Sequence, residues 1–131
     1  MAATLDADTV EEIEREAFTT PAAKIAAFLQ DHLGQKLTAY VAGLTDPKAV
    51  GSWIREENAP RQQAVLRLRC AYQIVRMLVE TYDDETAKAW LFGSNTRLND
   101  EAPAYLLRNA ASPDDLRQLV PTARAFAGSA E

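Results

Sequence analysis

The amino-acid sequence predicts an all-α protein, and two features of the chain carry that prediction. Apolar residues recur three and four positions apart through most of the 131 residues, which is the spacing of one face of a helix. Capping residues followed by proline mark helix starts, and glycines mark helix ends. A chain of this length can bury one core but not two full ones.

Residues 1–19 form the first segment, an acidic N-terminal helix or arm. Asp8 or Thr9 is a suitable N-cap for a helix that ends near Phe18. Because the segment is short and strongly acidic, it is either an accessory helix docked loosely on the body or a partly disordered arm.

Residues 20–60 have the pattern of a helix-turn-helix. After a helix that ends at Gly34 comes a shorter helix closed by Gly43, and Asp46-Pro47 begins another short helix that runs to about Glu57. Two short helices separated by a glycine are typical of this DNA-binding motif.

The second of these short helices carries the residues that would meet DNA. Trp53 and its apolar neighbours anchor the helix to the core, so polar side chains point outward. Lys48 can neutralise a phosphate, Ser52 can bond a base edge or a phosphate, and Arg55 can pair with a guanine. The DNA-binding candidates are Lys48, Ser52, Arg55 and Arg61. The alternative is that the two following glutamates repel DNA and the helix only packs.

The charge distribution bears on the same question. The net charge is −5, which argues against nucleic acid as a partner. Residues 47–76, however, carry six basic and two acidic residues, whereas residues 1–34 carry two basic and seven acidic residues. Local charge matters more than total charge within a Debye length of about 8–10 Å, so the basic segment is either a phosphate-binding footprint or a solvated helix face.

Residues 61–82 form a central linking helix. Its apolar surface is broad enough to be contacted on two sides, by the helix-turn-helix and by the C-terminal segment. One polar stripe remains, formed by Arg69, Gln73, Arg76 and Glu80. Cys70 is expected in or beside the core as an inert small hydrophobe.

Residues 83–131 form the C-terminal segment. An aspartate at position 83 or 84 caps a helix that ends at Gly93, an irregular turn follows, and Pro103 opens the next helix. Ser112-Pro113 begins the last helix, and Pro121 must kink or split it because the proline ring clashes with the carbonyl four residues back. We expect the chain end to be free.

Residues 88–107 resemble the C-terminal toxin-binding domain of the MbcA/ParS/Xre antitoxin family. The family signature is matched by Trp90, Asn95, Leu98, Pro103 and Leu106. Family members commonly have proline after the asparagine and glycines after the leucine, whereas this chain has Thr96 and then Asn99-Asp100. Asparagine and aspartate tolerate a left-handed backbone, so the turn can survive the change. With the region upstream, the resemblance covers about residues 35–128.

The resemblance implies a fold and a set of partners. The fold is an Xre-like helix-turn-helix bundle joined by the long central helix to a small helical toxin-binding domain. The partners are a cognate toxin, typically a RES-domain enzyme that destroys NAD, the operator DNA of the protein's own operon, and a second copy of the chain. The signature residues themselves are most simply structural, holding the surface that binds. The toxin-binding candidates are Trp90, Asn95, Arg97, Leu98, Pro103, Leu106, Arg124, Phe126, Ser129 and Glu131.

In characterised relatives the C-terminal segment of the antitoxin enters or covers the active-site cleft of the toxin. The resemblance therefore implies a docking role for residues 90–107 and a blocking role for residues 124–131. Deleting the residues after Pro121 is then expected to abolish neutralisation and to leave the fold intact.

The sequence contains no pattern that indicates catalysis. It lacks a glycine-rich phosphate loop, a dinucleotide fingerprint and a His-Glu-x-x-His motif, and its single histidine, His32, leaves no Ser-His-Asp set and no second metal ligand nearby. We therefore expect no enzyme, no cofactor and no metal site. The N-terminus lacks a secretory signal, and residues 65–79 are interrupted by three arginines, so we expect no membrane span and a cytoplasmic location.

Two alternative functions remain open. The chain can be a stand-alone dimeric transcription regulator of Xre type, in which the C-terminal domain mainly dimerises; the presence or absence of a neighbouring toxin gene separates this from an antitoxin. It can also be a helical adaptor that has lost DNA binding, as its acidic pI of about 4.9 suggests.

Overall fold

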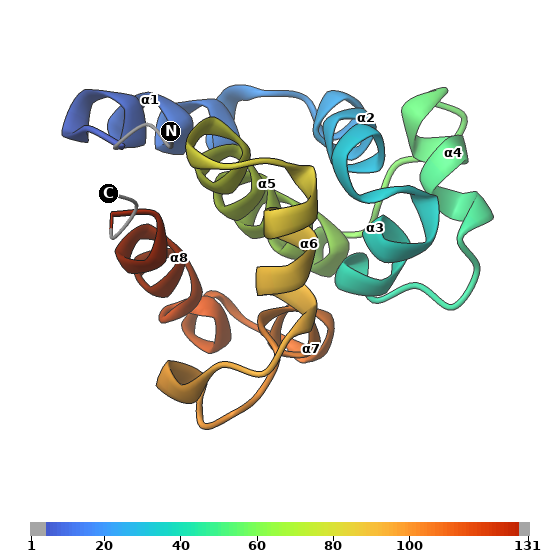
Figure 1. Cartoon of the computed structure of the whole chain (residues 1–131). Coiled ribbons are helices and arrows are strands. Elements are labelled where there is room, and N and C mark those ends of the chain that lie inside the picture. The colour runs from blue at the N-terminus through green and yellow to red at the C-terminus, as the bar shows by residue number, and fades with distance from the viewer. Residues whose placement is uncertain (1–4, 129–131) are drawn as a thin grey trace.

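The computed structural model describes residues 5–128, and every regular element in that range is helical, as predicted. Figure 1 shows the helices arranged around one long central helix. The helices are α1 (Ala7–Thr19), α2 (Ala22–Leu33), α3 (Gln35–Ala42), α4 (Lys48–Ile54), α5 (Gln62–Thr81), α6 (Asp84–Phe92), α7 (Pro103–Asn109) and α8 (Leu119–Gly128), with two 3-10 turns, η1 (Thr96–Leu98) and η2 (Pro113–Leu116).

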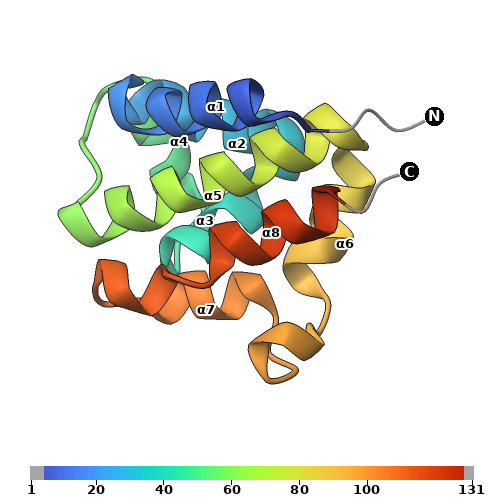
Figure 2. The same cartoon turned by 90° about the vertical axis from the view of Figure 1, so that its left-hand side faces the viewer.

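The central helix, α5, organises the molecule. It packs against α1, α2 and α3 from the first half of the chain and against α6, α7 and α8 from the second half (Figures 1 and 2). Leu68, Ile74 and Leu78 of α5 are completely buried, and the buried apolar residues of all eight helices form a single cluster. Trp53 of α4 and Trp90 of α6 both belong to this cluster. The predicted central helix is confirmed.

The polar stripe of α5 is the surface on which α1 docks. Arg69 donates hydrogen bonds to the carbonyl oxygens of Ala17 (2.7 Å) and Thr20 (2.8 Å) at the end of α1. Arg76 pairs with the Glu16 carboxylate. Ala17 is fully buried at the same contact, so α1 is held by both polar and apolar contacts rather than loosely docked.

The helix α1 also begins earlier than predicted. Its N-cap is Asp6, whose side chain accepts a hydrogen bond of 2.7 Å from the backbone nitrogen of Thr9. That backbone hydrogen bond lowers the pKa of the Asp6 carboxyl. The prediction of Asp8 or Thr9 as the cap was wrong because several adjacent residues had the chemistry of a cap.

The turn between α3 and α4 is closed at Gly43, as predicted. Gly43 has φ 87° and ψ 21°, a left-handed conformation in which its N–H bonds the Tyr40 carbonyl and the N–H of Leu44 bonds the Ala39 carbonyl. Two arginines also bind carbonyl groups at this turn. Arg67 of α5 donates to the Ala42 carbonyl at 3.0 Å, and Arg108 of α7 donates to the carbonyls of Tyr40 and Leu44 at 2.9 and 3.1 Å.

The helix α4 is shorter than the prediction, ending at Ile54 instead of about Glu57. Glu56 adopts a left-handed conformation with φ 59°, which no helix can continue. The Glu57 carboxylate then accepts hydrogen bonds from Arg55 and Ser52, so local polar contacts replace the last helical turn.

The last helix is split, as Pro121 requires. The segment after Ser112 forms only the 3-10 turn η2, and α8 starts afresh at Leu119. This places Pro121 in the first turn of α8, where its missing N–H has no helical partner to lose.

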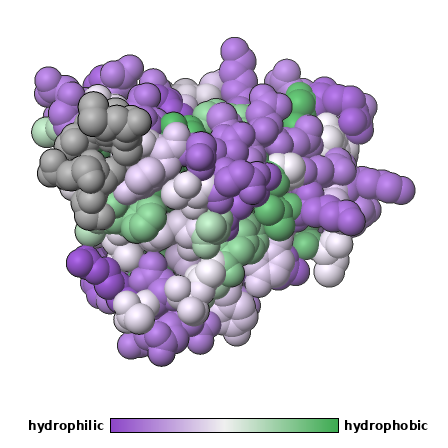
Figure 3. All heavy atoms as spheres, viewed as in Figure 1, coloured by the Kyte–Doolittle hydropathy of each residue, from purple (hydrophilic) through white to green (hydrophobic). Residues whose placement is uncertain are grey.

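Hydrophilic residues cover most of the face shown in Figure 3, and the hydrophobic residues on it are confined to small separate patches. In residues 5–128, no helix is long and apolar enough to cross a membrane. The single histidine, His32 at the end of α2, is used in packing. Its Nδ1 lies 2.7 Å from the Asp84 carboxylate of α6, and its ring lies against Phe28.

Candidate functional site

Two of the five signature residues, Trp90 and Asn95, line a hollow between α6, the turn after it and α8. The hollow has a volume of about 240 Å³. It is lined by Trp90, Asn95, Thr96, Arg97, Thr122, Ala125 and Phe126. We call it the Trp90 hollow. It brings residues 90–97 together with residues 122–126 of α8, which are far away in the sequence.

One wall of the Trp90 hollow is aromatic. Trp90 is 9% exposed, Phe126 is 37% exposed, and their ring centroids are 6.3 Å apart. Phe126 also lies against Tyr82, with ring centroids 5.3 Å apart, and the Tyr82 hydroxyl donates to the Phe126 carbonyl at 3.2 Å. The end of α8 is therefore fixed against Tyr82 at the end of α5, and the exposed edge of Phe126 has a defined position.

The opposite wall is a loop built on Asn95. The Asn95 side chain accepts a hydrogen bond of 3.0 Å from the Arg97 backbone nitrogen, and its carbonyl accepts from Leu98 and Asp100 at 2.9 and 2.8 Å. Leu98 is buried beneath the loop. These contacts hold Arg97 on the rim with its side chain exposed.

The same loop contains Asn99 and Asp100, which stand where members of the antitoxin family that this segment resembles commonly have glycines. Asn99 and Asp100 have φ values of 57° and 65°, which are left-handed. Asparagine and aspartate reach this region with less strain than other residues that carry a side chain, so the loop closes without glycine.

The eight predicted toxin-binding residues that lie within residues 5–128 divide into three groups. Trp90, Asn95, Arg97 and Phe126 line the Trp90 hollow. Leu98 and Pro103 are buried and Leu106 is half-buried, so these three support the surface rather than form it. Arg124 points to the other side of α8, into a different groove. Ser129 and Glu131 lie outside the described residues.

The expectation of a free chain end is wrong for residues 124–128. They belong to α8, and Ala127 is fully buried. Deleting everything after Pro121 would remove Ala123 and Ala127 from the core, so that deletion cannot leave the fold intact. The sequence did not predict that α8 packs on the core, because the two buried residues are alanines, which are only weakly hydrophobic.

Sequence reasoning also missed three residues of the hollow. Thr96, Thr122 and Ala125 have small side chains, and their size leaves the space between the two walls open. No local pattern marks them, since the pairing of residue 96 with residue 122 depends on how α8 returns to α6.

The lining of the Trp90 hollow contains side chains that can bind a partner through ring contacts and hydrogen bonds. Its lining offers two aromatic rings, a guanidinium, two hydroxyls and an amide, but no histidine, cysteine or carboxylate that could transfer a proton at neutral pH. In residues 5–128 there is also no group of three or more side chains suited to hold a metal ion.

The four DNA-binding candidates occupy two kinds of position. Lys48 and Arg61 are exposed and form no ion pair within residues 5–128. Arg55 is held by Glu57 with an N···O distance of 2.9 Å, and Ser52 lies 3.3 Å from the same carboxylate. The hydrogen bond from Arg55 lowers the pKa of the Glu57 carboxyl.

Half of the basic residues in segment 47–76 are used inside the protein. Arg67, Arg69 and Arg76 all bond other helices, as described above. Arg67 in addition donates to the Ala110 carbonyl at the end of α7, at 2.7 and 3.1 Å. Two of these three, Arg67 and Arg69, bind carbonyl groups at helix ends, so Lys48, Arg55 and Arg61 remain as the exposed basic residues of the segment.

No protein-family model, curated protein or solved structure matches this chain. Its relation to the antitoxin family therefore stays a prediction from the signature residues.

Proposed function

We propose that this chain is the antitoxin of a toxin-antitoxin pair and that it binds its toxin at the Trp90 hollow. The observation that supports the proposal is the convergence of Trp90, Asn95, Arg97 and Phe126 on one hollow. Three of these four were chosen from the C-terminal signature region alone, and Phe126 reaches them from another helix.

The composition of the hollow suits a protein partner. Tryptophan and arginine are enriched among residues that dominate the energy of protein interfaces, and such residues gather in well-packed pockets. A partner side chain with an apolar body and a carbonyl or carboxylate tip can contact Phe126 and accept hydrogen bonds from Arg97. A RES-type, NAD-degrading toxin is the expected partner, and covering its cleft requires no chemistry from the antitoxin.

Co-expression with the toxin encoded next to this gene tests the proposal. We expect the wild-type chain to co-purify with the toxin and to restore growth. Phe126→Ala and Arg97→Ala should each weaken binding at least tenfold, because each removes one wall of the hollow. Tyr105→Ala and Arg61→Ala are matched controls, since both are exposed and lie away from the hollow. Equal binding by all four variants would contradict the proposal.

The blocking role of the chain end needs a shorter deletion than one after Pro121. Removing residues 129–131 spares every described core residue, including Ala127. We expect this variant to keep its melting temperature and its binding to the toxin but to lose inhibition of NAD cleavage. Full inhibition by the shortened chain would restrict the proposal to docking at the hollow.

Autorepression of the operon is the second part of the proposed function. It is supported by the α3–α4 pair, with its left-handed Gly43 turn and the exposed Lys48 at the start of α4. Because few basic residues are available near α4, we expect DNA binding to depend weakly on salt. The logarithm of the binding constant should fall by about one unit per phosphate contacted for each tenfold rise in salt concentration. A gel-shift titration of the upstream region against random DNA, with and without toxin, measures this. If the upstream DNA does not shift at low salt with toxin present, the proposed autorepression is wrong.

A stand-alone dimeric regulator of Xre type is the second candidate, and the same α3–α4 pair favours it. It differs from the antitoxin in having no toxin gene beside it and in binding distant promoters. Loss of DNA binding in Lys48→Ala, together with no effect of Phe126→Ala in any assay, would favour this candidate.

A further inference from the structure

The two DNA-binding candidates at the end of α4, Ser52 and Arg55, share one acceptor, the carboxylate of Glu57. Oε2 of Glu57 accepts a hydrogen bond of 2.9 Å from Nε of Arg55, and Oε1 accepts a hydrogen bond of 3.1 Å from Nη2 of Arg55. The Ser52 hydroxyl donates to the same Oε1 at 3.3 Å. One carboxylate therefore engages the donors of both candidate residues.

The backbone after α4 holds this carboxylate in place. Glu56 has φ 59°, and this left-handed residue turns the chain back toward the helix. The N–H of Glu57 then bonds the Ser52 carbonyl at 2.9 Å, and the Asn58 side chain donates to the Ser52 hydroxyl at 3.1 Å. The Glu57 carboxylate is therefore positioned by the turn as well as by its attraction to Arg55.

The ion pair uses the edge of the Arg55 guanidinium that suits a phosphate. Nε and Nη2 donate two parallel hydrogen bonds to one carboxylate, which is the arrangement in which arginine also binds a phosphate group. The third nitrogen, Nη1, lies against α4, 3.0 Å from where a Cβ on Gly51 would stand. A phosphate that binds this edge of Arg55 would therefore have to displace the Glu57 carboxylate.

The contact is exposed enough to be displaced. The side chains of Arg55 and Glu57 are 61% and 54% exposed, and ion pairs in contact with water are weak. A competitor of this strength lowers the affinity for a phosphate a few-fold and does not prevent its binding.

We propose that Glu57 is a built-in competitor for the DNA phosphate group that Ser52 and Arg55 would otherwise bind. The inference rests on the proposed binding of DNA by α4, and it adds a contact that regulates the affinity. It differs from general repulsion of DNA by acidic residues. Repulsion would also act through the adjacent Glu56, which forms no ion pair within residues 5–128, whereas competition acts through Glu57 alone.

Two substitutions that remove the same charge separate competition from repulsion. Glu57→Gln and Glu56→Gln each remove one negative charge, from adjacent exposed positions. In a gel-shift titration of the upstream DNA at physiological salt, we expect Glu57→Gln to strengthen binding about threefold to fivefold. Glu56→Gln should strengthen binding less than about twofold. A thermal melt of each variant checks that it is folded.

The gain in affinity must depend on Arg55. In an Arg55→Ala background, Glu57→Gln should strengthen binding no more than Glu56→Gln does, because the side chain that Glu57 restrains is gone. Equal gains from the two glutamate variants of the wild type would overturn the inference. A full gain from Glu57→Gln in the Arg55→Ala background would also overturn it.

A measurement without DNA separates the inference from the proposed function. Pyrophosphate is the probe, and the NMR signal of the Arg55 Nε–H group reports a change of its hydrogen-bond partner. We expect this signal to shift at a severalfold lower pyrophosphate concentration in Glu57→Gln than in the wild type. If it does so but neither protein binds the upstream DNA, the autorepression proposal fails and Glu57 still competes with phosphate. If the two proteins respond at the same pyrophosphate concentration, the inference is wrong whether or not DNA binds.

Discussion

Glu56, just after α4, has a backbone conformation that residues with a Cβ seldom adopt. Its φ is 59° and its side chain is exposed. The left-handed conformation costs about 1–2 kcal/mol for such a residue, whereas glycine loses about 0.5–1 kcal/mol through its greater freedom in the unfolded chain. We therefore expect Glu56→Gly to raise the free energy of unfolding by about 0.5–1 kcal/mol, as measured by urea denaturation.

Glu101→Gly provides the control for this prediction. Glu101 is also an exposed glutamate outside a helix, but it is not among the residues with positive φ. The control should lose stability, because only the entropic cost of glycine remains. A gain of equal size in both variants would show that backbone strain at Glu56 is not the cause.

Burial controls the ionisation of Cys70. Desolvation raises the pKa of its thiol from 9.0 to about 12. A pKa that is higher in the folded state contributes stability at pH values below the unfolded-state pKa, and this stability is lost as pH rises toward the folded-state pKa. Between pH 8 and pH 10, the wild type should therefore lose about 1.5 kcal/mol more free energy of unfolding than Cys70→Ala does.

Urea denaturation of the two proteins at both pH values measures the difference. Reaction of the native thiol with Ellman's reagent at pH 8 should also be slow, and it should become fast in urea. Parallel pH dependence in the two proteins, or rapid labelling of the native wild type, would contradict the burial of the thiol.

At the scale of helices, Arg67 is the residue that joins the two halves of the chain. From α5 it donates to the Ala42 carbonyl at the end of α3 and to the Ala110 carbonyl directly after α7. A Cβ at Gly43 would collide with this guanidinium, in addition to the strain from φ 87°. We expect Gly43→Ala to cost about 3 kcal/mol in the wild type and only about 1–2 kcal/mol in an Arg67→Ala background.

A double-mutant cycle measures this coupling by chemical denaturation. Arg61→Ala is the control background, because Arg61 is exposed and should leave the effect of Gly43→Ala unchanged. If Gly43→Ala costs the same in all three backgrounds, the guanidinium is not what restricts the turn.

The helices differ in how well local sequence predicted them. The range predicted for the central helix, 61–82, agrees with α5 to within one residue at each end, since its apolar pattern is long. The break before α8 was predicted from Pro121, whereas the end of α4 depends on the left-handed Glu56, which a periodic pattern does not contain. The docking of α1 was unpredictable locally, because Arg69 bonds residues about fifty positions away.

For the whole molecule, a single buried cluster implies one cooperative unfolding transition. Trp53 and Trp90 lie in different halves of the chain, and both belong to this cluster. Trp90→Phe leaves Trp53 as the only tryptophan, and Trp53→Phe leaves Trp90. Within each variant, we expect the fluorescence midpoint in urea to coincide with the midpoint from far-ultraviolet circular dichroism.

The comparison is made inside each variant, so any loss of stability from the substitution itself cancels. A fluorescence midpoint that differs from the circular dichroism midpoint in either variant would show that the helices before α5 and the helices after it unfold separately.

The candidate site was predicted only in part for the same long-range reason. The signature region supplied one wall of the Trp90 hollow, and Phe126 was named with it. Thr122 and Ala125 were not, because only the return of α8 across α5 places them opposite Thr96.

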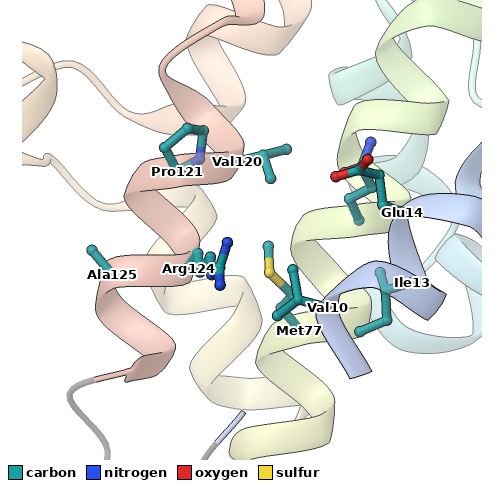
Figure 4. Close-up of a pocket in the computed structure, with 9 residues that line it drawn as sticks. Val10, Ile13, Glu14, Met77, Val120, Pro121, Arg124 and Ala125 are labelled. Carbon is teal, nitrogen blue, oxygen red and sulfur yellow. The ribbon is translucent and has the colours of Figure 1, made fainter. Parts of the chain in front are cut away.

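The helix α8 forms one wall of the Trp90 hollow and also one wall of a pocket of about 480 Å³ between α1, α5 and α8 (Figure 4), and Ala125 lines both. A molecule that binds in one of these two pockets and shifts α8 also changes the shape of the other pocket. By thermodynamic reciprocity, the two affinities then change by the same factor. Through the ten residues of α8, binding of one molecule can therefore raise or lower the affinity for a second molecule.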